Sequence, residues 1–184
     1  MNVAAIVIIL LVVIVLAGVL LYNGLVQARF AVSEAWSAVQ VQLQRRANLI
    51  PNLVETVSGY ARHERGTLES VTRARAQLQS ATTPVEAAQA NNMLTQALRS
   101  LFAVAEAYPD LKANQNFLDL QAQLSDTENK IAYARNYYNS RVLDYNTRIS
   151  SVPGVFLAGA FGFQPSEFFK AEEASEEPVR VKFE

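Results

Sequence analysis

The chain has 184 residues and a formal net charge of −1, a size that fits one membrane anchor followed by one domain of about 150 residues. This near-neutral charge gives no electrostatic argument for a nucleic-acid partner or an acidic substrate. The sequence contains no cysteine, which excludes disulfides, thiolate metal sites and a cysteine nucleophile.

The N-terminal segment is apolar without interruption. Residues 3–21 carry no charged side chain, and about 20 apolar residues in a helix cross the roughly 30 Å hydrocarbon core of a bilayer. Backbone polar groups in lipid must be satisfied within the segment, so we expect a transmembrane helix. No Lys or Arg precedes it and no small-x-small cleavage motif follows it, which argues against a secretory signal. The residues expected in the bilayer include Val3, Ile6, Leu10, Ile14, Gly18 and Leu21.

The charges that flank this segment bear on its orientation. Arg29, Arg45 and Arg46 follow the segment, whereas only the terminal amine precedes it. The positive-inside rule then favours an N-terminus outside the cell and a following domain in the cytoplasm, although Glu34 among these arginines weakens the bias.

Apolar residues after the membrane segment recur with alternating spacings of four and three, from Val32 and Trp36 to Ala74 and Leu78. This 3.5-residue repeat is typical of helices packed in a bundle or coiled coil. Pro51 lies inside the repeat without changing its phase, so we expect one helix kinked at Pro51. Continuous with the membrane segment, this helix would end near Gln79 and reach roughly 115 Å at 1.5 Å per residue.

Two further helices are expected. Thr83 and Glu86 form a capping-box pattern around a proline at the first helical position, which predicts a helix start. That helix should end at Tyr108-Pro109-Asp110, and a third should run from about Asn114 to Ile149. Short connections make consecutive helices antiparallel. We therefore predict an all-α protein with an anchor over residues 1–23 and an elongated antiparallel bundle of three long helices over 24–150, in which Trp36, Pro51, Thr83, Glu86 and Pro109 have structural roles.

Residues 151–169 form an apolar segment rich in glycine and phenylalanine that is too short to cross a bilayer. Large exposed apolar patches usually mark interaction sites. Three interpretations stay open: insertion into the membrane interface, a contact between subunits, or a lid on the end of the bundle. The residues concerned are Phe156, Gly159, Phe161, Gly162 and Phe163.

Residues 170–184 form an acidic tail that ends in an alternating pattern. Val179, Val181 and Phe183 alternate with polar or charged residues, a period typical of an extended strand. The tail is either a disordered end or a strand that pairs with another subunit or another membrane protein.

Asparagine and tyrosine recur at two places in the chain. Buried amides in a helical seam fix its register, and tyrosines place a polar tip at a wet interface. The cluster is therefore either internal to the bundle or a contact with the membrane or a neighbouring subunit. An antiparallel third helix would bring its members toward the membrane exit. The residues are Tyr22 and Asn23 after the membrane segment, and Tyr138, Asn139, Tyr145 and Asn146 on the third helix.

The strongest candidates for catalysis do not form a complete motif. His63-Glu64 lacks the second histidine of a zinc-protease helix, because position 67 is a threonine. With one histidine and no cysteine, a transition-metal site within one subunit is not expected. Acidic residues near one end of the bundle are expected to form ion pairs with Lys112, Lys130 or Arg135: Glu106, Asp110, Asp126 and Glu128. We therefore predict no enzyme activity and no cofactor.

Short motifs follow one another in a fixed order along nearly the whole chain: 22–26 (YNGLV), 35–36 (AW), 41–43 (VQL), Arg46, 49–54 (LIPNLV), 59–64 (GYARHE), 106–113 (EAYPDLKA), 127–132 (TENKIA), 138–139 (YN), 145–146 (YN) and 161–163 (FGF). Together these motifs resemble the LemA family. Ala47-Asn48 departs from the family pattern, which has an acidic residue there.

The resemblance implies a bacterial protein with one N-terminal transmembrane helix, an antiparallel helical domain and no established enzyme activity. Relatives are linked to membrane organisation, including the biogenesis of magnetosome membranes. Our first hypothesis is a single-pass protein of the bacterial cytoplasmic membrane that self-associates into a membrane-shaping scaffold, with lipids and further copies of itself as partners and no nucleic acid. Our second hypothesis is an adaptor whose tail docks a membrane protease or another membrane complex. An enzyme of unknown class is the least favoured.

Overall fold

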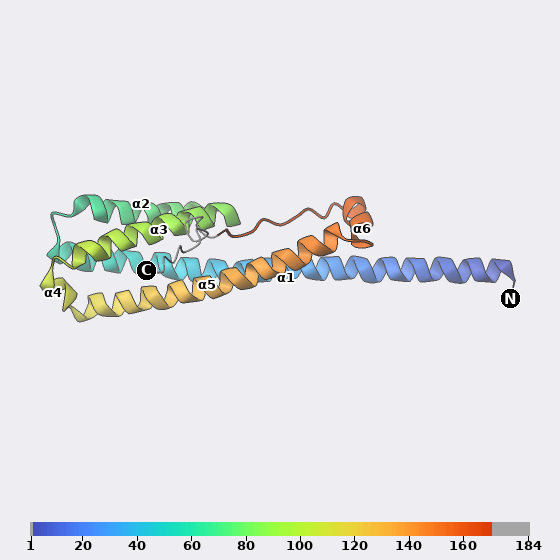
Figure 1. Ribbon diagram of the computed structural model, residues 1–184, viewed down its shortest axis with the longest axis horizontal. Coiled ribbons are helices and arrows are strands. Elements are labelled where there is room, and N and C mark those ends of the chain that lie inside the picture. Colours follow the sequence, from blue (N-terminus) through green and yellow to red (C-terminus); the bar gives the residue numbers. More distant parts are fainter. Residues whose placement is uncertain (1, 171–184) are drawn as a thin grey trace, which may run out of the picture. The chain divides into compact units, whose positions relative to one another are not determined.

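The computed structural model describes residues 2–170, whose regular secondary structure is entirely helical (Figure 1). The described residues form the helices α1 (Val3–Tyr60), α2 (Arg65–Ser80), α3 (Pro84–Ala105), α4 (Pro109–Lys112), α5 (Gln115–Ser150) and α6 (Gly154–Phe161). The all-α class predicted from the apolar repeat is confirmed.

The chain divides into two compact units, and both α1 and α5 contribute to each. The anchor unit joins the residues up to Ala38 with Asn136–Glu167. The bundle unit joins Val39–Arg135 with the described residues from Phe168 onward.

In the bundle unit, the first long helix ends earlier than expected. α1 ends at Tyr60, residues 61–64 form a turn, and α2 begins at Arg65. The Nε of Arg75 on α2 donates a hydrogen bond of 2.9 Å to the carbonyl of Ala47, so α2 packs back along α1. The prediction of one continuous helix to Gln79 is wrong, because both arms of this hairpin present the same apolar repeat to a shared core. Pro51 lies within α1, which continues on both sides of it.

The bundle unit therefore contains four long helical segments and not three: the end of α1, α2, α3 and the start of α5. The helices α2 and α3 lie side by side (Figure 1). The rings of Phe102 on α3 and Phe117 on α5 meet edge to face at 6.0 Å. Short connections join antiparallel neighbours, as in other helical bundles. Fully buried side chains in its core include Val39, Ile50, Leu53, Val57, Val71, Leu94, Leu101 and Leu111.

Side-chain caps define the starts of two helices. The hydroxyl of Thr83 accepts a hydrogen bond of 3.2 Å from the backbone N–H of Glu86, whose carboxylate accepts one from the N–H of Thr83. Hydrogen bonds from the backbone and side chain of Thr82 and from the backbone of Thr83 lower the pKa of Glu86. The side chain of Asn114 likewise accepts from the N–H of Phe117 at the start of α5. These contacts satisfy helix-terminal donors and confirm the predicted starts of the second and third helices.

In the anchor unit, the start of α1 pairs with the end of α5. The rings of Trp36 and Tyr138 lie 5.3 Å apart. After Ser150 the chain turns into α6, whose first residue, Gly154, is buried. The helix ends at Gly162 in the left-handed conformation, with φ of 70°, which glycine adopts without steric cost.

The corner between α5 and α6 requires glycine at its first position. A Cβ atom on Gly154 would lie 2.1 Å from the carbonyl oxygen of Arg148, whereas one on Gly159 would have no neighbour within 4 Å. We predict that Gly154→Ala destabilises the protein by about 1–3 kcal/mol through overpacking. The control Gly159→Ala should be neutral, or stabilising by up to about 1 kcal/mol, because alanine is the better helix former.

Thermal unfolding of both full-length variants in mild detergent, followed by circular dichroism, checks this difference. Equal melting temperatures for the two variants would contradict the close approach at Gly154.

Candidate functional site

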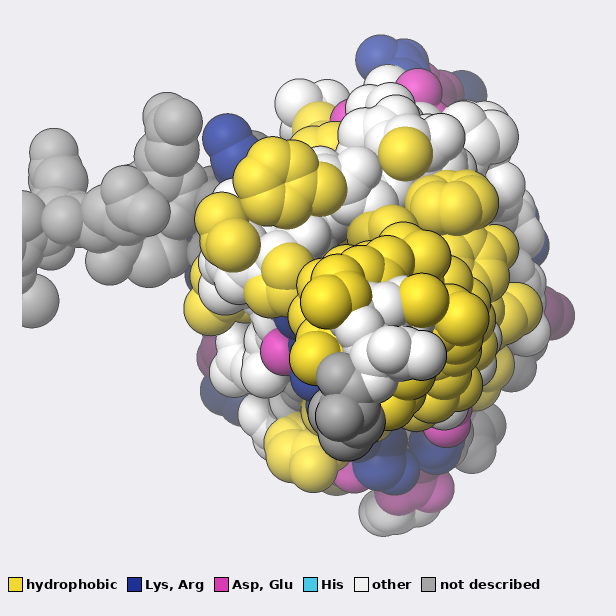
Figure 2. Space-filling view, turned by 90° about the vertical axis from the view of Figure 1, so that its right-hand side faces the viewer, with side chains coloured by type: hydrophobic (Ala, Val, Ile, Leu, Met, Phe, Trp, Pro, Cys, Tyr) yellow, Lys and Arg dark blue, Asp and Glu magenta, His cyan; other side chains and the backbone are white. Residues whose placement is uncertain are grey.

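The candidate site in the anchor unit begins with the apolar start of α1. By length and composition, α1 is the one described helix able to cross a membrane, and its most apolar stretch has no buried residue. Figure 2 shows this end of the molecule, where hydrophobic side chains cover almost the whole surface of the helix. Such a surface on a helix is expected to face lipid.

The corner between α5 and α6 lies beside the residues that follow this apolar stretch. The ring of Tyr22 meets the rings of Phe161 at 5.0 Å and Phe163 at 5.8 Å. A groove of about 330 Å³ separates α1 from the corner, lined by Leu20, Leu21, Gly24 and Leu25 on one side and by Thr147, Arg148 and residues 151–154 on the other. These contacts place α6 level with the end of the apolar stretch.

The helix α6 turns large apolar side chains outward. Gly154 and Ala158 are buried, whereas Phe156 is 72% exposed and Val152, just before the helix, is 76% exposed. Phe161 is also exposed, and Phe163 is buried. Of the segment 151–169, Gly159 and Gly162 lie at the surface as well.

An extended segment after α6, which we call the strap (residues 163–167), runs back along α5. The side-chain amide of Asn146 donates to the carbonyl of Ser166 and accepts from its N–H, both at 2.9 Å. The hydroxyl of Tyr145 donates to the carbonyl of Gln164 at 3.0 Å. The hydroxyl of Tyr138 donates to the carbonyl of Glu167 at 2.7 Å. Three side chains of α5 thus bind the backbone of the strap.

Burial of these tyrosines changes their acidity. Burial, followed by the nearby negative charge of Glu167, raises the pKa of Tyr138 to about 12. Burial also raises the pKa of Tyr145, and the charge of Arg29 acts in the opposite direction. Both phenols therefore stay protonated near neutral pH and remain hydrogen-bond donors to the strap.

The asparagine and tyrosine residues singled out in the sequence lie at different places. Tyr138, Tyr145 and Asn146 bind the strap, Tyr22 packs on α6, and Asn23 is exposed. Asn139 is half-buried on α5 and also has an interaction partner. The strap was not predicted from the sequence. Its hydrogen bonds are made by its backbone, so its own side chains do not indicate them. Val179, Val181 and Phe183 of the tail lie outside the described residues.

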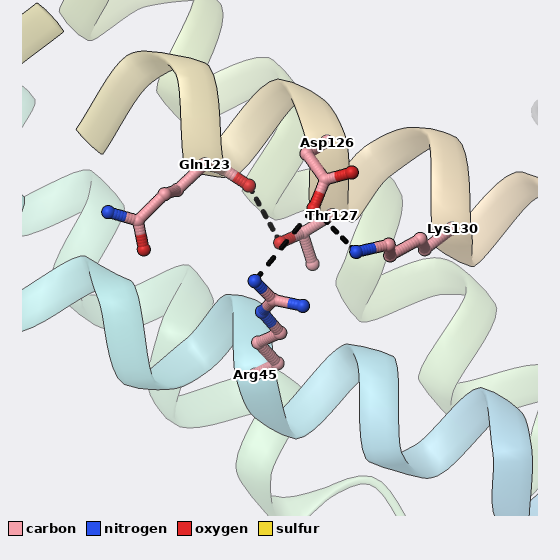
Figure 3. A network of polar contacts seen from close by, with 5 residues as sticks. All are labelled: Arg45, Gln123, Asp126, Thr127 and Lys130. Carbon is pink, nitrogen blue, oxygen red and sulfur yellow. Dashed lines mark hydrogen bonds and ion pairs between the residues drawn. The ribbon is translucent and has the colours of Figure 1, made fainter. Parts of the chain in front are cut away.

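A polar cluster in the bundle unit connects α1 with α5 (Figure 3). The carboxylate of Asp126 lies 2.8 Å from Lys130 and 3.8 Å from Arg45. The hydrogen bond from Lys130 lowers the pKa of Asp126. Thr127, which is fully buried, donates its hydroxyl hydrogen to the carbonyl of Gln123 at 2.7 Å.

The residue that follows Arg45, Arg46, carries a buried charge. Its side chain is 4% exposed and lies 2.8 Å from the carboxylate of Glu128, which is 44% exposed. A hydrogen bond of 2.5 Å goes from Arg46 to the side-chain oxygen of Asn91 on α3. Burial lowers the pKa of Arg46, and the charge of Glu128 raises it in part. The side chain thus links α1, α3 and α5.

Three of the four acidic residues considered for catalysis, Glu106, Asp126 and Glu128, are engaged in ion pairs. Glu106 pairs with Lys112, and Asp126 with Lys130, as the sequence predicted. Arg45 and Arg46 add pairs that were not predicted. Among the described residues, no group of three or more His, Cys, Asp or Glu side chains is arranged to hold a metal ion.

Comparison with known proteins identifies the family. The LemA family profile matches residues 35–183, which include most of the bundle unit and the strap. This chain belongs to the LemA family. The resemblance found in the sequence is thereby confirmed.

Relatives within and around the LemA family share only part of their length with this chain. Magnetosome protein MamQ 2 of Paramagnetospirillum magneticum is 32% identical over 83 residues, 45% of this chain and 30% of that protein. Magnetosome protein MamQ of Magnetospirillum gryphiswaldense is 31% identical over 83 residues, which are likewise 45% of this chain and 30% of that protein. Protein LemA of Metamycoplasma hominis is 28% identical over 131 residues, 69% of this chain and 58% of that protein. Family membership and the exposed apolar stretch of α1 together indicate a membrane-anchored protein.

The contact between Asn146 and the strap of this LemA-family protein can be tested at one backbone amide, that of Ser166. We expect Asn146→Ala to remove both hydrogen bonds to Ser166, each contributing about 1 kcal/mol. Hydrogen exchange at the Ser166 amide should then be roughly 30-fold faster, since 1.4 kcal/mol corresponds to a factor of ten. Hydrogen–deuterium exchange measures this directly. Asn48→Ala, which removes an exposed contact with Gln44, is the control. Equal protection of the Ser166 amide in both variants would contradict the role of Asn146 in holding the strap.

The buried arginine gives a second prediction. Glu128→Gln removes the negative charge beside Arg46 while keeping the side-chain size, so a buried cation loses its counter-charge. We expect a loss of stability of about 1–3 kcal/mol, below the range for fully buried pairs because Glu128 is partly exposed to solvent. The control Asp126→Asn alters pairs that are about half exposed and should cost less than about 1 kcal/mol. Urea denaturation of the full-length protein compares them, and an equal cost would argue against a special role for Arg46.

Proposed function

We propose that this LemA-family protein is a non-enzymatic scaffold that is anchored in the bacterial cytoplasmic membrane and organises the membrane by self-association. The observation that carries the anchoring is the apolar stretch of α1, with the exposed apolar surface of α6 beside its membrane exit. Self-association is proposed to use exposed apolar side chains other than those of α6, such as Phe30 on α1, which is 71% exposed, because exposed apolar patches mark interaction sites.

The interior of both units supports a mechanical role. Most buried positions of the bundle unit are filled by aliphatic and aromatic side chains, and Glu106, Asp126 and Glu128 are paired with Lys or Arg. In the anchor unit, the polar side chains of Tyr138, Tyr145 and Asn146 bind the chain's own backbone. These side chains therefore contribute to structure rather than to a reaction.

The proposed orientation places the N-terminus outside the cell and the bundle unit in the cytoplasm. Arg29 follows closely after the apolar stretch of α1, and the positive-inside rule counts such a charge close to a span. Lipids and further copies of the chain are the proposed partners. The names of two relatives link MamQ proteins to the magnetosome, and a role in membrane organisation is consistent with those names.

Particle size tests the proposal. We expect full-length protein, extracted in mild detergent or in native lipid discs, to form large particles of defined size by electron microscopy and mass photometry. Closed assemblies are expected because repeated heterologous contacts close into rings when their rotation permits. Monomers or dimers would contradict the scaffold and would favour the adaptor.

A deletion separates the two hypotheses further. Removing residues 178–184 should leave the particles intact if assembly depends on the anchor unit. A pulldown from native membranes with the full-length and the shortened protein then tests the adaptor hypothesis. That hypothesis predicts that a partner protein is recovered with the full-length protein and lost with the shortened one.

A further inference from the structure

We infer that α6 is an interfacial helix that inserts its outer face into the leaflet from which α1 emerges. This inference rests on the membrane anchoring within the proposed function and names the lipid surface as the partner of α6. It concerns one helix of eight residues, GVFLAGAF, which contains no charged or strongly polar side chain.

The level of α6 along α1 follows from contacts within the anchor unit. The apolar stretch ends at Leu21, and the next residue, Tyr22, packs against Phe161 and Phe163 at the end of α6. The residues before α6 lie across the groove from Leu20, Leu21 and Leu25. Both ends of α6 are therefore beside the last turns of the apolar stretch, where the bilayer ends.

The orientation of α6 about its own axis follows from burial. Gly154 and Ala158, four residues apart, form the inner face. Phe156 lies on the outer face, together with the small residues Gly159 and Ala160, and Val152, in the turn before the helix, is exposed as well. The side chains with most apolar area thus point away from the protein, although a soluble surface would favour the opposite arrangement.

The neighbouring residues match the layers of a membrane interface. Tyrosine is enriched at the level of the lipid headgroups, and Tyr22 occupies that level next to α6. Arg29, about 10 Å further along α1 at 1.5 Å per residue, is exposed and suits anionic headgroups. An interfacial helix lies about 5–10 Å into the boundary between headgroups and acyl chains, a depth at which Phe156 would contact acyl chains.

Site-directed spin labelling tests this depth. The chain has no native cysteine, so one introduced cysteine gives one label. Phe156→Cys reports the outer face of α6, and Leu11→Cys reports the lipid-facing stretch of α1. Leu143→Cys is the matched control, because Leu143 is an exposed apolar residue of the same unit. It lies on α5 between Tyr138, which packs on Trp36, and Tyr145, which lies near Arg29.

The labelled full-length proteins are placed in vesicles of phosphatidylethanolamine and phosphatidylglycerol. Collisions of each label with oxygen, which concentrates in hydrocarbon, are compared with collisions with a water-soluble nickel chelate. We expect the oxygen-to-nickel ratio at Phe156 to shift toward the value at Leu11 and away from the value at Leu143. Val152→Cys, at an exposed apolar position in the turn just before α6, provides a second measurement if Phe156→Cys folds poorly.

Two results would overturn the inference. A ratio at Phe156 equal to that at Leu143 would place α6 in water. Low collision rates with both reagents would mean that protein covers α6, as in a contact with a second copy of the chain. The readout is independent of particle size, so a monomeric protein with an inserted label would refute the scaffold and leave the interfacial helix standing.

Discussion

Every other described helix packs on α1 directly or through a neighbouring helix. In lipid, the first stretch of α1 must be helical. The backbone of an apolar span must satisfy its own hydrogen bonds, and α1 extends this regular geometry without a break to Tyr60. Its later residues then present a 3.5-residue seam to which α2, α3 and α5 contribute the other walls of the bundle unit. The requirement that lipid imposes on residues 3–21 thus provides the template on which both units are built.

The sequence predicted those features that local chemistry determines. The capping box at Thr83 and Glu86 and the cap at Asn114 mark helix starts through contacts within four residues, and both are present. The turn at residues 61–64 was not predicted, because the spacing of the apolar residues continues unchanged from α1 into α2. Spacing alone therefore does not distinguish two helices joined by a turn from one continuous helix. The strap was also not predicted, since its partners Tyr138, Tyr145 and Asn146 lie about 20–30 residues earlier and contact only its backbone.

Polar residues inside apolar seams explain much of the specificity of this fold. Arg46 occupies a position of the seam where an aliphatic side chain would pack more simply, and it binds Asn91 and Glu128 on two other helices. Polar groups at such positions select one register among several of similar apolar content. Asn146 has a comparable effect in the anchor unit, where it fixes the position of the strap along α5.

The bond pair between Asn146 and Ser166 also sets unequal limits on sequence divergence. Both contacts on the strap side are backbone atoms, so any residue with an N–H group preserves them at position 166, and proline alone removes the donor. Asn146, by contrast, supplies a donor and an acceptor in one planar side chain that few residues can replace. The side chain at position 166 is therefore free to vary among homologous chains while the two hydrogen bonds to Asn146 stay the same.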